Sequence, residues 1–300
     1  MNKEIRKLNR KDNISAGLML APAVFLLILT SVYPFTWLFR YILYDYNGFN
    51  AYFIGLDNFK RAFTDAVFWR SVLHTFEYAS LKLLLVIPFS LVMAAMVRSH
   101  IPGNGAFKII FFLPTVISSS VSSLIFTFIF SAFNGPLNAI LMNMGMISAP
   151  IDWLGDPRYV MAAILIVAFW GGVGNYMIYF LSGLSSISND VYESCKIDGA
   201  NASQTFFKIT LPMLSPILKV VLMLAITTSF KDYQSILVLT QGGPNNRSQV
   251  MFSYIYQLIF PQNSMPEIGY GTVLSILAAM IIGIITVIYN IVAKKLDDVV

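Results

Sequence analysis

The sequence predicts an all-α, polytopic membrane protein. Of its 300 residues, 57% are hydrophobic and only 12% are charged, and the mean hydropathy is +0.69. So few charged side chains cannot cover the surface of a soluble protein of this length. Four stretches, 13–39, 109–151, 159–189 and 268–293, contain no Asp, Glu, Lys or Arg. A helix needs roughly 20 apolar residues to cross a bilayer core, so each stretch is long enough to span it.

Six membrane spans are expected along the chain. The first covers 14–39 and follows a basic segment, 1–13; it is too long for a signal peptide and lacks a small-residue cleavage pattern, so we expect it to be uncleaved. The others are expected near 72–97, 107–130, 160–181, from Pro212 or Pro216 to 238, and 272–292. The second contains two charged residues, Glu77 and Lys82. Residues 14–300 would then form one membrane domain, with both ends of the chain on the same side.

The distribution of basic residues predicts the orientation. Lys and Arg are more frequent in the segments on the N-terminal side of the membrane than in those on the other side. Because cytoplasmic segments carry the excess of basic residues, both termini are expected in the cytoplasm, with the chain in the cytoplasmic (inner) membrane. Basic residues that flank spans indicate topology, so we expect the lipid bilayer as a partner and no nucleic acid.

Composition argues against several enzyme classes. One cysteine, Cys195, cannot make a disulfide framework or a thiolate zinc cluster, and two histidines, His74 and His100, leave little for metal chemistry. The chain contains no G-x-x-x-x-G-K-[ST] pattern, so a partner would have to bind any ATP. We therefore expect no catalytic residues, no metal and no cofactor in this chain.

The segment 185–216 is the one sizeable polar feature expected in the cytoplasm. Residues 189–198 can form a short helix, with Asn189 as a possible N-cap and acidic residues in its first turn. Gly199 would end that helix, and 201–209 could form a second turn or two before Pro212. From these residues alone, the segment could equally be a solvated amphipathic loop on the membrane surface.

The same loop resembles the EAA loop of permeases of binding-protein-dependent ABC importers. Its pattern is Glu193-x-x-x-x-Asp198-Gly199-Ala200, followed by Phe206-x-x-Ile209-Thr210-Leu211-Pro212. Six further motifs resemble the carbohydrate-uptake branch in order: Gly55-Leu56-Asp57-Asn58-Phe59, Phe111-Phe112-Leu113-Pro114, Asp152-Trp153-Leu154-Gly155-Asp156-Pro157, Trp170-x-x-x-Gly174, Leu239-Thr240-Gln241-Gly242-Gly243-Pro244 and Tyr254-Ile255-Tyr256. Departures are Ser194-Cys195 for two alanines, His74 for asparagine and Ser188 for proline.

The resemblance implies a function and a set of partners. A permease of this family works with a second permease subunit, an ATP-binding-cassette ATPase dimer that uses ATP and Mg, and an extracytoplasmic solute-binding protein, and it carries a sugar or oligosaccharide. This chain would be a transport subunit without its own ATP-binding site. The residues implied to couple it to the ATPase are Glu193, Asp198, Gly199, Ala200, Phe206 and Pro212.

Two polar patches within spans are candidates for the substrate pathway. The fifth span carries Lys231 and Asp232 in a run of hydroxyl, amide and aromatic side chains, the groups that bind sugars. These two charges could instead be anchors that reach the membrane surface. The fourth span carries a glycine-rich patch that could serve a ligand or only helix packing. Resemblance to the maltose member of the family implies Gly172, Asn175, Thr228, Ser229 and Asp232, and Trp170 is a further candidate.

Two other protein classes would also fit a bundle of spans. A secondary transporter or channel would use Asp232 as its mid-span carboxylate, but it has no need of the loop 185–216. A membrane-embedded enzyme would need nucleophiles and bases that converge, which two well-separated histidines do not supply.

Overall fold

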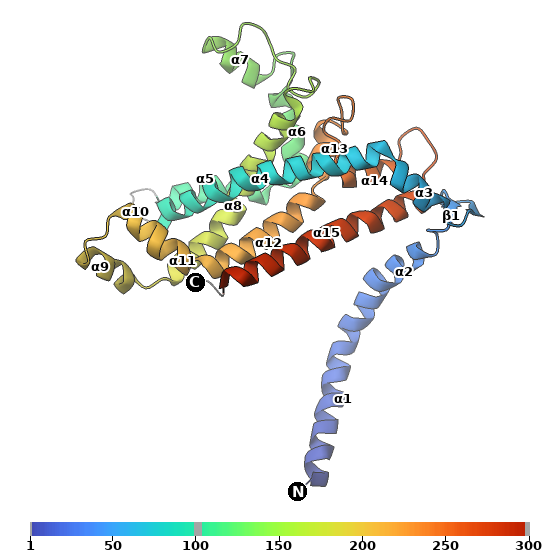
Figure 1. Ribbon diagram of the computed structural model, residues 1–300, viewed down its shortest axis with the longest axis horizontal. Helices are drawn as coiled ribbons and strands as arrows, with labels where there is room; N and C mark the ends of the chain where they lie inside the picture. Colours follow the sequence, from blue (N-terminus) through green and yellow to red (C-terminus); the bar gives the residue numbers. More distant parts are fainter. Residues whose placement is uncertain (1, 99–103, 298–300) are drawn as a thin grey trace. The chain divides into compact units, whose positions relative to one another are not determined.

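The computed structural model describes residues 2–98 and 104–297 and shows a mostly helical chain (Figure 1). His100, one of the two histidines, lies outside the described residues. The described chain divides into two compact units. The first holds residues up to Thr64 together with Leu258–Ile276, and the second holds Asp65–Gln257 and the residues from Leu277 onward.

The first unit begins with a long apolar helix. α1 (Asn2–Leu27), the π-helical η1 (Ile28–Val32) and α2 (Tyr33–Phe39) follow one another. The part from Ser15 to Phe39 is long and apolar enough to cross a membrane, and none of it is buried in the described chain. Exposure of so large an apolar surface to water is unfavourable, so this helix requires lipid or another apolar surface around it.

A short hairpin and helix complete the first unit. Strands β1 (Tyr44–Tyr46) and β2 (Ala51–Phe53) pair antiparallel, and α3 (Asp57–Thr64) follows. Gly55 has φ +60°, and the buried Asn58 amide donates hydrogen bonds to the carbonyl oxygens of Ile42 (3.2 Å) and Tyr44 (2.9 Å). Glycine tolerates a positive φ at little cost, and the asparagine satisfies buried carbonyl groups. The Gly55–Phe59 motif therefore forms the connection between the hairpin and α3.

The second unit is built on three long helices, α4 (Ala66–Arg98), α8 (Val160–Ser186) and α12 (Ser215–Lys231). α4 packs extensively on α8, and α12 contacts both of them (Figure 1). Their buried apolar residues form one core, which includes Val86, Ala94, Val173, Phe180, Leu184, Leu214 and Val221. The remaining helices of the described chain are α5 (Asn104–Val116), α6 (Ser119–Ile129), α7 (Pro136–Asn143), α9 (Asn189–Ile197), α10 (Ala202–Thr205), η2 (Phe206–Thr210), α11 (Leu211–Met213), α13 (Gln234–Leu239), α14 (Met251–Ile259) and α15 (Ile268–Asp297). The last two each have residues in both units.

The described chain contains four continuous helices that could cross a membrane, at Ser15–Phe39, Ala66–Arg98, Val160–Ser186 and Ile268–Lys295. The other two predicted spans are bent pairs of helices. α5 and α6 meet at 100°, so the third span is not the single helix expected over 107–130. The fifth is bent by 70° between Met213 and Ser215, and its helix stops at Lys231 before α13 begins. The all-α membrane fold is confirmed, and the count of six spans stays a prediction.

The glycines of the fourth span permit close packing of α8 on α5. A Cβ atom at Gly174 would lie 1.9 Å from the carbonyl oxygen of Phe111, which belongs to the α5 backbone. At Gly171, three residues earlier, a Cβ atom would meet nothing within 4 Å. Close helix packing therefore explains why a glycine is needed at position 174. No such contact explains the glycine at position 171.

We predict that Gly174→Ala destabilises the protein and that Gly171→Ala does not. The backbone of α5 cannot move aside as the end of a flexible side chain can. The added methyl group should therefore lower the free energy of unfolding by about 1–3 kcal/mol through overpacking. The matched Gly171→Ala should be neutral, since alanine favours a helix over glycine. Thermal unfolding of the detergent-purified protein measures both. Equal melting temperatures for the two variants would contradict this account of the α5–α8 contact.

Candidate functional site

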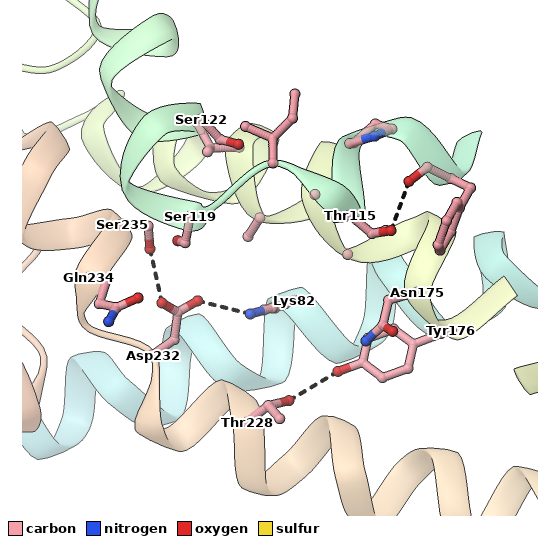
Figure 2. Close-up of a pocket in the computed structure, with 17 residues that line it drawn as sticks. Lys82, Thr115, Ser119, Ser122, Asn175, Tyr176, Thr228, Asp232, Gln234 and Ser235 are labelled. Carbon is pink, nitrogen blue, oxygen red and sulfur yellow. Dashed lines mark hydrogen bonds and ion pairs between the residues drawn. The ribbon is translucent and has the colours of Figure 1, made fainter. Parts of the chain in front are cut away.

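A cavity of about 600 Å³, with both polar and apolar residues in its lining, lies in the second unit where two interrupted helices meet the long ones. The break between α12 and α13 forms one wall, and the bend between α5 and α6 forms another (Figure 2). Helices α4 and α8 complete it. Its lining residues are Lys82, Phe112, Pro114, Thr115, Ile117, Ser119, Ser122, Val167, Ala168, Gly171, Gly172, Asn175, Tyr176, Thr228, Asp232, Gln234 and Ser235. Lys82 and Asp232 are the charged members of this set.

Asp232 is the centre of a hydrogen-bonded cluster at the first break. Its backbone is extended (φ −71°, ψ 119°), so α12 ends and the carboxylate turns into the unit. One carboxylate oxygen accepts hydrogen bonds from Lys82 Nζ (2.9 Å) and the Tyr78 hydroxyl (2.6 Å). The other accepts from Ser235 Oγ at 3.0 Å. The side chains of Lys82 and Asp232 are only 12% and 18% exposed, and charged groups so buried are stable only when paired.

This geometry overturns one sequence-based alternative. Asp232 is not an anchor that reaches out to the membrane surface, because its carboxylate is held by three partners inside the unit. Its neighbour Lys231 is the exposed residue and does not line the cavity. The two adjacent charges, which the sequence suggested treating together, therefore have different surroundings.

Four predicted pathway residues line the cavity, Gly172, Asn175, Thr228 and Asp232, and two do not. Trp170 packs edge-on against Phe126 at 5.4 Å between ring centroids. Ser229 is buried, and within the described chain its hydroxyl has no hydrogen-bond partner. Successive residues of a helix are rotated by about 100°, so Ser229 faces away when Thr228 faces the cavity.

Sequence reasoning missed Lys82, Tyr78 and Tyr176 as parts of this site. Tyr176 hydrogen-bonds to Thr228 Oγ1 at 3.0 Å, which ties α8 to α12. The available signal was Lys82 itself. A lysine within an apolar span requires an acidic partner, and Asp232 is the acidic residue of the fifth predicted span.

A second ion pair holds the loop that follows α13 against α4. Arg247 donates to both carboxylate oxygens of Glu77, at 2.6 and 2.7 Å, and this bonding raises the pKa of the guanidinium. One turn earlier on α4, His74 Nδ1 lies 3.3 Å from the Gln249 carbonyl oxygen. The Thr75 hydroxyl accepts a bond from the backbone N–H of Met251. His74, to which the sequence assigned no role, therefore contacts the backbone of this loop.

The loop 185–216 has the predicted helix, glycine corner and second helix, with one correction. Ser188, and not Asn189, is the N-cap of α9, because its Oγ accepts the backbone N–H of Asp190. α9 ends in a Schellman motif: Gly199 has φ +74°, and the N–H of Ala200 bonds to the carbonyl oxygen of Cys195 at 3.0 Å. Asn201 and Gln204 then form a capping box that starts α10.

The coupling candidates in this loop divide by exposure. Glu193, Asp198 and Gly199 are exposed on α9 and its end, as is Pro212. Ile197 between them is 86% exposed, which is unusual for so apolar a side chain. Ala200 and Phe206 are partly buried, and Phe206 packs against the core of the three long helices. The exposed surface of α9 and its end thus includes the acids Glu193 and Asp198 and the apolar Ile197, while Phe206 packs the second half of the loop against the core.

Residues 82–298 match the family model of the inner membrane component of binding-protein-dependent transport systems. The chain belongs to this family. The match begins at Lys82 and includes all the residues that line the cavity as well as the whole loop 185–216. The permease is therefore the membrane-embedded transport component and not an ATP-binding subunit. Both alternatives, a secondary transporter or channel and a membrane enzyme, are thereby wrong.

Named relatives resemble the permease over nearly its whole length. It is 29% identical over 282 residues to the lactose transport system permease protein LacF of Rhizobium radiobacter, which covers 93% of this chain and 94% of LacF. It is 31% identical over 287 residues to a probable starch degradation products transport system permease protein, AmyD, of Thermoanaerobacterium thermosulfurigenes, with 95% and 96% covered.

A solved structure shows the same fold. The permease superposes on a chain of a bacterial ABC transporter that imports the acidic polysaccharide alginate, with a TM-score of 0.84 over 98% of this chain and 99% of the other. Sequence identity is 23%, so the similarity concerns the fold.

Proposed function

We propose that this permease carries a sugar or oligosaccharide across the cytoplasmic membrane as one subunit of an ABC importer. It would act with a second permease subunit, an ATPase dimer that binds ATP and Mg, and an extracytoplasmic solute-binding protein. The family match, which includes both the cavity and the loop 185–216, carries this proposal. The names of LacF and AmyD support a carbohydrate as substrate.

Membrane placement follows from the same proposal. If each bent pair crosses once, the permease has six spans and its two termini lie on one side. The excess of basic residues on that side supports a cytoplasmic location for both termini.

The cavity has the chemistry of a passage for an uncharged sugar. Hydroxyl and amide groups of Ser119, Asn175, Thr228 and Gln234 face it (Figure 2), and they can replace the water that a sugar loses. Its two charges, Lys82 and Asp232, neutralise each other at 2.9 Å. Such a site offers no net charge to an anionic ligand, so we propose neutral sugars as its substrates.

Both helix interruptions at the cavity support a path for solute. Irregular backbone at membrane depth is tolerated only where it is buried in protein or lines a water-filled space. Ile117 and Asp232 lie at such interruptions, and both line the cavity.

The loop 185–216 is proposed as the contact with the ATPase. Glu193 and Asp198 can make charge-assisted bonds to a partner, and Ile197 can fill an apolar pocket beside them. The Schellman corner at Gly199 gives this surface a fixed shape, which transmission of a movement requires.

The first test of the function is assembly. We expect the permease to co-purify with a second permease and an ATPase, and to transport sugar in liposomes only with both partners, binding protein and ATP. The physical reason is the absence of a P-loop from the sequence, so that energy must come from a partner. Sugar uptake by the permease alone, driven by an ion gradient, would overturn the proposal.

Substitutions at Gly199 test the role of the loop. Gly199→Ile and Gly199→Asn both place a side chain in open space, but a β-branched residue tolerates φ +74° far less well than asparagine. We expect Gly199→Ile to lose transport and co-purification with the ATPase at normal abundance in the membrane. Gly199→Asn should retain most of both. Wild-type transport by Gly199→Ile would contradict the coupling role.

Substitutions at Asp232 test the cavity. We expect Asp232→Ala to lower uptake of a neutral oligosaccharide roughly tenfold or more, because a lost hydrogen bond to a charged group costs about 1.5–3 kcal/mol. Lys231→Ala, at the exposed neighbour, is the matched control and should transport normally. The measurement is the initial rate of uptake at subsaturating sugar.

The double variant Lys82→Met with Asp232→Leu separates two causes of this loss. It leaves no unpaired lysine, so its thermal stability should exceed that of Asp232→Ala while its uptake stays low. Normal uptake by Asp232→Ala would show that the sugar does not use this residue.

A further inference from the structure

Arg98, the last residue of α4, connects that helix to the loop 185–216. Its guanidinium donates to the hydroxyl of Tyr192 at 2.6 Å and to the carbonyl oxygen of Ile187 at 3.1 Å. It also lies 4.5 Å from the centre of the Tyr192 ring. One side chain thus binds the end of α8 and the first turn of α9 together.

Tyr192 extends this connection to the second half of the loop. The Thr210 hydroxyl, at the end of η2, donates to the same Tyr192 oxygen at 3.3 Å. The Tyr192 ring and its neighbour Val191 pack against the core of the three long helices. Helix α9, which carries the exposed acids, is therefore held by these contacts to α4, α8 and η2.

The helix that carries Arg98 also carries the cation of the cavity. Lys82 lies 16 residues earlier on α4, about 24 Å away at a rise of about 1.5 Å per residue. Between them, α4 packs closely along α8 through the buried residues Val86, Ile87 and Ala94. Pro88 removes one backbone hydrogen bond from α4 between them, but α4 is packed into the core on both sides of this residue, so a displacement at Arg98 is transmitted along α4 toward Lys82.

We propose that Arg98 is a positioning residue that joins the ATPase-facing loop to α4, so that movement of the loop reaches the cavity. The inference rests on the proposed function of the loop. Lysine cannot replace arginine here, because only the planar guanidinium reaches two acceptors and covers an aromatic ring at once. Loss of the joint should leave ATP hydrolysis running without transport.

The experiment measures sugar transported per ATP hydrolysed in the complete complex in liposomes, with binding protein present. Arg98→Gln is expected to lower this ratio about tenfold, and Arg98→Lys should lower it as well. Tyr192→Phe, which keeps the ring and removes the hydroxyl, should give a smaller loss. Lys108→Gln, which removes an exposed positive charge from α5, is the matched control and should leave the ratio unchanged.

The ratio separates a joint from a merely structural contact. Damage to folding lowers transport and ATP hydrolysis together, whereas a broken joint lowers transport alone. In a double-mutant cycle, Tyr192→Phe should add little to Arg98→Gln, because the bond that it removes is already lost. If Arg98→Gln fails to assemble, the ratio for Tyr192→Phe decides the question.

Two outcomes overturn different parts of the argument. Suppose that Arg98→Gln transports as much sugar per ATP as the wild type while Gly199→Ile stays inactive. This result would refute the joint at Arg98 and keep the coupling role of the loop. Where Arg98→Gln fails to assemble, the same ratio for Tyr192→Phe decides. Wild-type transport in Gly199→Ile would refute the coupling role itself, and the joint with it.

Discussion

The second unit depends on one constraint, that charged groups in a membrane-spanning core must be paired. Lys82 and Asp232 come from the second and fifth predicted spans, and their 2.9 Å contact brings α4 to the end of α12. Without Lys82, the carboxylate would have no counter-ion among its three hydrogen-bond partners. The break after Lys231 is what allows the carboxylate to turn inward. The ion pair and the break that lets Asp232 turn inward are therefore consequences of one requirement.

Helix α4 collects three such polar attachments along its length. Glu77 holds Arg247 of the loop after α13, Lys82 holds Asp232, and Arg98 holds Tyr192 of α9. Apolar packing allows two helices several registers, whereas a bond between two particular side chains, whether one of the two ion pairs or the Arg98–Tyr192 hydrogen bond, is made in only one register. The three attachments therefore fix α4 relative to the loop after α13, the α12–α13 break and the loop 185–216.

Much of this arrangement could be predicted from the sequence, and the rest depends on contacts between distant residues. Apolar stretches predicted the helices, and the Glu193–Ala200 pattern predicted a helix that ends at a glycine corner, because both signals are local. The bend at Ile117–Ser118 was not predicted, because 109–130 carries no charged residue and was taken as one span, although it contains Pro114 and a run of serines. Ser229 was misplaced because a one-residue step decides which side of a helix faces the cavity. Asp232 could be identified as the partner of Lys82 only with knowledge of which spans are neighbours.

Acidic residues illustrate how surroundings, and not residue type, decide a role in this permease. Glu77 and Asp232 are paired with Arg247 and Lys82, so most of their bonding capacity holds the fold together. Glu193 and Asp198 of the same chain are exposed on α9, on a backbone that the Schellman motif and Arg98 keep rigid. A rigid surface with available acids binds a partner at low entropic cost. The paired acids hold together the helices to which the loop 185–216 is bound. They therefore help to keep the exposed acids in a fixed position for binding a partner.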